Sequence, residues 1–240
     1  MVNVLDFMNY TYIFAIVLLI IVLIVLLWVH LRYRLTLKLI LIAIAIGVLS
    51  SFAGNQINQM GINLGIINKS DPLFNFAYAF FATGLSMQLL QFLFLNILIY
   101  PSKEFNTPVF GLMHCVWISI GAIIPEIFII DYSTFPMIAT FNILRHISTA
   151  LVLGYFISMA KFSMNPTENF TYLNSGLASA IIIQGLHEFF ILERQIPNLI
   201  VLLLGTAFLG LILTAHLFRQ ENQVNKEKST LEDSYPEDYN

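Results

Sequence analysis

The stretch IFAIVLLIIVLIVLLWV, residues Ile13–Val29, consists of seventeen consecutive apolar residues. This length predicts a membrane-spanning helix, because the hydrocarbon core of a bilayer needs about 17–25 apolar residues of helix. His30, Arg32 and Arg34 follow the stretch, whereas residues 1–9 contain no Lys or Arg. A cleavable signal peptide has its positive charge before the apolar run instead, so we expect an uncleaved anchor.

The composition of the whole chain agrees with this interpretation. Of the 240 residues, 58% are hydrophobic and 10% are charged, whereas a soluble domain has about 25% charged residues. Only α-helices and closed β-barrels satisfy all backbone polar groups within lipid. Barrel strands would give segments of about ten alternating residues, and this chain has long unbroken apolar runs instead. The sequence therefore predicts an all-α, polytopic transmembrane bundle.

Six further apolar segments follow the first, which gives about seven spans in residues 1–218. The longest connection between them is residues 54–71, and one interpretation of it is an amphipathic segment along the membrane interface. The six segments are approximately Leu35–Ala53, Leu73–Tyr100, Val109–Ile130, Thr134–Ala160, Thr171–Leu192 and Ile196–Phe218.

The basic residues near the helix ends predict the orientation, because cytoplasmic loops retain an excess of Lys and Arg. With the N-terminus outside, Lys69 and Arg194 lie outside. Residues 219–240 contain three basic and six acidic residues and almost no apolar ones, so we expect a disordered cytoplasmic tail there. The basic residues on the cytoplasmic side are then Arg32, Arg34, Lys38, Lys103, Lys161, Arg219, Lys226 and Lys228.

Two classes of function are disfavoured by charge and cysteine usage. The net charge is −3, and the basic residues are spread along the chain rather than gathered on one face. This pattern does not favour a nucleic-acid partner. The single cysteine, Cys115, allows neither an internal disulfide nor a CxxC redox motif.

Several polar residues lie within the predicted spans. An ionised side chain at the bilayer centre costs about 2.5–3.5 kcal/mol on insertion scales and usually faces the bundle interior. Gln184, His187 and Glu188 are spaced i, i+3 and i+4, so they share one helix face. These groups are either hydrogen-bonded packing contacts between helices or the lining of one cavity reached from the outer leaflet. The ionisable candidates for that cavity are Glu126, Arg145, His146, His187 and Glu188.

Five stretches of the chain, in order, resemble a known family. AFFATGLSMQLLQFLFL at Ala79–Leu95 resembles the core helix of the PrsW family of intramembrane proteases, which is distantly similar to the CAAX-processing endopeptidases. The likeness continues through four shorter stretches and covers about residues 75–190. These stretches are YPSKEFNTPVFG at Tyr100–Gly111, GAIIPEI at Gly121–Ile127, Arg145-His146 with LGYF at Leu153–Phe156, and QGLHEF at Gln184–Phe189.

The chain departs from the family at its signature motifs EExxK, FxxxE and HxxxD. The first becomes MQLLQ at 87–91, the second AIIPE at 122–126, and the third QGLHE at 184–188. Only Glu126 and a carboxylate at Glu188 are kept. Met87, Gln88, Gln91 and Gln184 replace the other signature residues. Glutamine cannot accept a proton at neutral pH and is a poor metal ligand beside imidazole. The resemblance therefore implies a catalytically degenerate homologue, in the bacterial cytoplasmic membrane, that needs no cofactor.

Three functions are compatible with these residues. In the first, the degenerate homologue contacts membrane lipid and binds a transmembrane or juxtamembrane segment of a partner protein. In the second, the chain is an active intramembrane metallopeptidase. A relocated Zn²⁺ site would then use Glu126, His146, His187 and Glu188, which offer carboxylate and imidazole ligands. In the third, the buried Arg145 and the acids belong to a small-solute or ion transporter.

Overall fold

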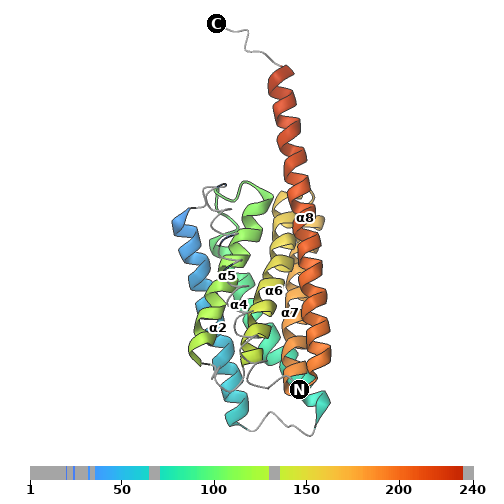
Figure 1. Cartoon of the computed structure of the whole chain (residues 1–240). Helices are drawn as coiled ribbons and strands as arrows, with labels where there is room; N and C mark the ends of the chain where they lie inside the picture. The colour runs from blue at the N-terminus through green and yellow to red at the C-terminus, as the bar shows by residue number, and fades with distance from the viewer. Residues whose placement is uncertain are drawn as a thin grey trace.

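A computed structural model of the protein describes residues 36–64, 71–129 and 136–234, together with Ile20, Ile24 and Arg32. Each regular element in these ranges is a helix (Figure 1), so the predicted all-α class is confirmed. Apart from Ile20 and Ile24, the predicted first span Ile13–Val29 lies outside the described residues. The elements are α2 (Leu37–Asn63), α3 (Pro72–Ala77), η1 (Tyr78–Leu85), α4 (Ser86–Leu98), α5 (Pro108–Ile129), α6 (Pro136–Phe162), α7 (Pro166–Leu192) and α8 (Ile196–Ser234).

Six helices among the described residues are long and apolar enough to cross a membrane. They are α2, the continuous α3–η1–α4 segment, α5, α6, α7 and α8, and they correspond to the six segments predicted after the first. The helices stand side by side as a bundle (Figure 1). This architecture is compatible with an integral membrane protein.

The structure differs from the sequence prediction at two helix ends. Helix α2 continues to Asn63, so an interfacial segment beginning at Gly54 is wrong for residues 54–63. Helix α8 continues to Ser234 and extends well beyond the bundle (Figure 1), where the sequence predicted an irregular tail from residue 219. Residues 219–234 contain no Gly or Pro and are rich in Gln, Glu and Lys, which are good helix formers, so nothing in them ends α8.

Prolines and capping side chains begin several of the helices. Asp71 accepts hydrogen bonds from the backbone N–H groups of Leu73 and Phe74, and Pro72 opens α3. In the same way, Asn165 accepts from the N–H of Thr167, and Pro166 opens α7. Proline fits the first helical position because its missing N–H would have no partner there. Pro72 and Pro166 thus mark the starts of α3 and α7.

Two glycines allow α2 and α5 to approach closely. A Cβ atom added at Gly47 would lie 1.9 Å from the carbonyl oxygen of Ile118, and one added at Gly121 would lie 2.2 Å from that of Ile44. No side chain fits at either position without moving a backbone. Small residues are favoured at membrane helix interfaces because they permit such contacts.

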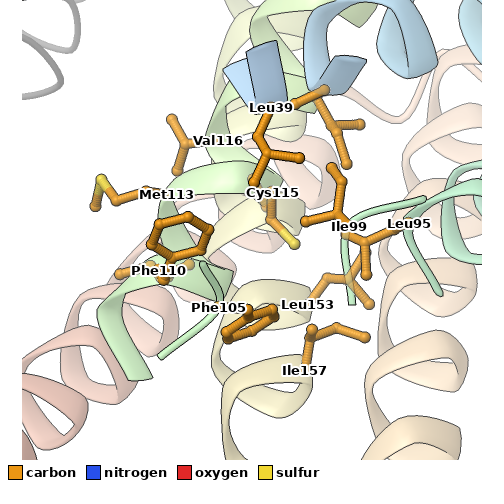
Figure 2. Close-up of a cluster of buried hydrophobic side chains, with 14 of the residues drawn as sticks. Leu39, Leu95, Ile99, Phe105, Phe110, Met113, Cys115, Val116, Leu153 and Ile157 are labelled. Carbon is orange, nitrogen blue, oxygen red and sulfur yellow. The ribbon is translucent and has the colours of Figure 1, made fainter. Parts of the chain in front are cut away.

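An apolar cluster joins several of the helices and one loop (Figure 2). It joins Leu39 of α2, Leu95 of α4, Cys115 of α5 and Leu153 of α6, and Phe105 of the α4–α5 loop packs into the same cluster. These side chains are at most 5% exposed. The loop is therefore held to the bundle by the core and not only by its helix ends.

Polar contacts show which helix ends lie together. The hydroxyl of Thr36 donates to Glu104, and Lys161 Nζ donates to the carbonyl oxygen of Tyr100 at 2.6 Å. At the other end of the bundle, Asn75 Nδ2 donates to Glu193 Oε1 at 2.8 Å. The start of α2, the α4–α5 loop and the end of α6 therefore share one end of the bundle, opposite the α7–α8 loop.

Replacing Gly121 by Ala tests the α2–α5 contact. The new methyl group would overlap Ile44, so Gly121→Ala is expected to lower the free energy of unfolding by about 1–3 kcal/mol or more. Gly205→Ala on α8 is the matched control, because no atom lies within 4 Å of a Cβ added there. Denaturant unfolding in detergent compares the two variants. Equal stabilities would contradict the close approach.

Candidate functional site

Three ionisable side chains from α5 and α6 meet in one buried cluster. Arg145 Nη2 lies 2.8 Å from Glu126 Oε1 and 2.6 Å from His146 Nε2, and His146 Nε2 lies 3.0 Å from Glu126 Oε1. All three residues are buried, with exposures of 3%, 6% and 2% for Arg145, Glu126 and His146. We call these three residues the ion-pair cluster.

The short Arg145–His146 contact constrains the imidazole. A guanidinium has only hydrogen-bond donors, so His146 Nε2 must offer a lone pair to Arg145 Nη2. This requires a neutral imidazole with its proton on Nδ1, and Nε2 then makes no hydrogen bond to Glu126 Oε1, because both atoms are acceptors. Arg145 then donates to both Glu126 and His146 and neutralises the carboxylate. Because the charges of Arg145 and Glu126 balance, the pair tolerates burial that a lone charge would not, although among the described residues Glu126 Oε2 and Arg145 Nε have no hydrogen-bond partner.

Two residues of α7 lie near this cluster without a hydrogen bond to it. His187 lies within electrostatic range of Arg145, Glu126 and His146, and Glu188 within range of Arg145 and Glu126. His187 is fully buried, and among the described residues neither of its ring nitrogens has a hydrogen-bond partner. Glu188 is only partly buried. The structure thus gathers all five ionisable candidates on three neighbouring helices.

The position of Arg145 is unfavourable for a divalent cation. Its guanidinium lies where a metal shared by Glu126 and His146 would have to lie, and it carries the same sign of charge. In the part of the chain that the structure describes, no three His, Cys, Asp or Glu side chains are grouped to hold one metal ion. In this arrangement Glu126 and His146 have an arginine partner instead.

The glutamines of α4 belong to a second polar region, a small cavity beside His146. Residues of α4, α5 and α6 enclose it, and its volume, taken as the space open to the centre of a water molecule, is about 10 Å³. His146 is the residue common to the cavity and the ion-pair cluster. The lining residues are Gln88, Gln91, Cys115, Ile118, Ser119, His146, Thr149, Ala150 and Leu153.

The other two substituted signature positions lie elsewhere. Met87 packs against α2, because its Cβ is 3.4 Å from a Cβ built at Gly54. Gln184 is buried on α7 and is not among the cavity-lining residues. Positions 87, 88, 91 and 184 therefore do not converge on one pocket.

Sequence reasoning missed Ser119 and Thr149. The hydroxyl of Ser119 donates to the carbonyl oxygen of His146 at 2.8 Å, which ties α5 to α6 beside the cavity. Thr149 lies one turn after Arg145 on α6. The only sequence signal was this spacing of three and four residues from His146 and Arg145, and serine and threonine are too common in membrane helices for it to be distinctive.

Comparison of the chain with protein-family models, with curated proteins and with solved structures gave no match. Fold and site define a class: an α-helical bundle compatible with membrane insertion, with a buried arginine–carboxylate–histidine cluster between α5 and α6. These comparisons assign no family to the chain, so assigning it to a particular family is a proposal.

A double-mutant cycle tests the ion-pair cluster. Glu126→Gln and Arg145→Met each leave an uncompensated buried charge, so each is expected to cost about 3–5 kcal/mol of unfolding free energy. The double variant removes both charges and should cost clearly less than the sum of the single variants. Glu168→Gln, at an exposed carboxylate, is the control and should change stability by less than about 0.5 kcal/mol. Additive costs at 126 and 145 would contradict the pairing.

Proposed function

We propose that this chain is a catalytically inactive homologue of the PrsW-like intramembrane proteases, and that it binds a transmembrane or juxtamembrane segment of a partner membrane protein. The observation that supports it most is the ion pair between Arg145 and Glu126, the one carboxylate retained without change at a signature position. The proposal places the chain in the bacterial cytoplasmic membrane, as the resemblance implies.

Hydrolysis of a peptide bond in such a site needs a group that takes a proton from water. The positions where the family has its acids on the core helix hold Met87 and Gln88, which cannot do so. Glu126 has its charge neutralised by a guanidinium 2.8 Å away. This chemistry favours a structural role for Glu126 over a role as general base.

A partner segment is favoured by Glu188, which is only partly buried although it lies within a span. It is four residues from the end of α7 at Leu192, or about 6 Å along the helix. A carboxylate at this depth is costly against lipid and is stabilised by a protein or water neighbour. We infer that a polar or basic residue of the partner segment covers Glu188.

The orientation that we propose has the N-terminus outside and the C-terminus in the cytoplasm, with seven spans. Lys38, Lys103 and Lys161 lie at the end of the bundle where α2 begins and α6 ends, while Arg194 lies at the opposite end. The excess of basic residues at the first end supports its assignment to the cytoplasm.

The orientation is tested by cysteine labelling in sealed cells. Val2→Cys should react with an impermeant maleimide added outside, and Tyr235→Cys only after the cells are opened. Buried Cys115 serves as the internal background. Labelling of both positions from the same side would exclude seven spans.

Metal analysis and a cleavage assay test the loss of catalysis. The purified chain is expected to hold far less than one zinc ion per molecule and to leave membrane peptides intact. Glu126→Gln should then lower stability without changing any cleavage rate. Stoichiometric zinc with chelator-sensitive cleavage, abolished by Glu126→Gln or His146→Ala, would overturn the proposal in favour of the metallopeptidase alternative.

Site-specific photocrosslinking tests the partner segment. A photoreactive residue in place of Glu188 should give one dominant adduct, and mass spectrometry should map it to a membrane-spanning or membrane-adjacent peptide. Val201, whose side chain is exposed on the lipid-facing side of α8, is the matched control position. Equal adducts from both positions, or none from 188, would contradict the proposed site.

A further inference from the structure

The cavity between α4, α5 and α6 has a polar wall that direct hydrogen bonds do not satisfy. Among the described residues, Gln88 Oε1, Gln91 Nε2 and Thr149 Oγ1 are buried atoms without a hydrogen-bond partner, and all three residues line this cavity. The residues are 1%, 4% and 4% exposed. Buried polar atoms in folded proteins almost always have a partner, which is often an ordered water. Three such atoms around one cavity are best explained by one hydrogen-bond partner that all three share.

We propose that this cavity binds one ordered water molecule, which bridges α4 to α6. The water donates to Gln88 Oε1, accepts from the amide of Gln91, and forms a third hydrogen bond with the hydroxyl of Thr149. Buried waters make about three hydrogen bonds on average, as this set provides. The site does not depend on the PrsW-like proposal, since it rests only on the cavity and its lining.

The size and charge of the cavity select water over other ligands. Its volume of about 10 Å³ is close to the minimum of roughly 10–15 Å³ needed by one water. An organic solute is too large for it. The free atoms belong to uncharged amides and a hydroxyl, and the charges of Arg145 and Glu126 nearby are already paired with each other. A neutral molecule that both donates and accepts hydrogen bonds matches this lining, whereas an ion would lack a counter-charge.

The water also explains how α4 is joined to the centre of the bundle. The side chains of Gln88 and Gln91 line the cavity together with residues of α5 and α6, but no hydrogen bond between these glutamines and those helices is found in the described part of the chain. A bridging water supplies that connection. Apolar side chains that filled the cavity would displace the water and remove the connection between α4 and the other two helices.

Radiolytic hydroxyl-radical footprinting of the wild-type protein tests the site, because radicals formed from a bound water attack the side chains beside it. Cys115 lines the cavity and is 2% exposed, while Met113 is a similarly buried sulfur residue, 5% exposed, that does not line it. Each rate is normalised to that of the denatured chain. Cys115 is expected to be modified at least several-fold faster than Met113, with ¹⁸O incorporated from labelled water. Equal protection of the two residues would overturn the proposal.

The sign of a stability change is an independent second test. If water satisfies Thr149, then Thr149→Val removes a hydrogen bond and should lower the melting temperature by about 2–4 °C. If the cavity is dry, the same substitution replaces an unsatisfied hydroxyl by a methyl group and should raise it. A control variant must leave the cavity volume unchanged, which excludes Ala150→Val. Thr206→Val on α8, which loses a hydrogen bond to the carbonyl of Leu202, is the positive control and should lower the melting temperature. A melting temperature of Thr149→Val above that of the wild type would also overturn the proposal.

Discussion

The buried charge of Arg145 is the constraint on which the centre of the bundle depends. A guanidinium cannot lose its proton in a protein, so an apolar bundle can hold it only beside a negative charge and hydrogen-bond acceptors. Glu126 and His146 supply these from 2.8 Å and 2.6 Å. Because Glu126 is on α5 and Arg145 on α6, the pair fixes the register of the two helices. The Ser119–His146 contact, also between α5 and α6, then follows from that register.

The close α2–α5 contact complements this polar constraint with a steric one. Gly47 and Gly121 remove side chains from the contact, so that backbone meets backbone. Residues on the other faces of α5 are then free to meet α6 and the apolar cluster shown in Figure 2. Helix α5 is thus held against α2 by a close backbone contact and against α6 by the ion pair between Glu126 and Arg145. This explains why it is more deeply buried than α8, much of whose surface faces outward.

Much of the fold could be predicted from the sequence, because unbroken apolar runs and loop prolines have direct physical causes. The six described spans agree with six predicted segments to within a few residues at most ends. The ends of α2 and α8 were wrong for a shared reason. Polar residues such as Asn55, Gln56 and Glu221 look like the end of a span, but they are also compatible with continued helix, and hydropathy alone cannot separate the two.

The sequence predicted that the charged residues of the candidate site lie together, but it did not predict where its neutral polar residues lie. Each charge inside a span is so costly that its presence is itself a signal, and Glu126, Arg145 and His146 do meet. Gln88 and Gln91 were noticed as replacements at signature positions, but their separation from Gln184 depends on how α4 and α7 turn in the bundle. The π-helical turn η1 just before α4 changes that rotation, and one extra residue per turn cannot be read from a hydrophobic pattern.

The amide side chain at position 88 agrees with the same electrostatics. Once Arg145 is neutralised by Glu126, a further carboxylate at position 88 would lie across a small cavity from His146 without a cation of its own. Glutamine keeps the shape and the hydrogen-bonding capacity of glutamate there while avoiding that cost. A polar cavity can therefore persist beside a balanced ion pair without a group that takes up protons. The chemistry of hydrolysis needs the opposite arrangement, in which charge is left unbalanced until substrate or metal arrives. Under the proposed function, the interior of this bundle serves hydrogen bonding rather than proton transfer.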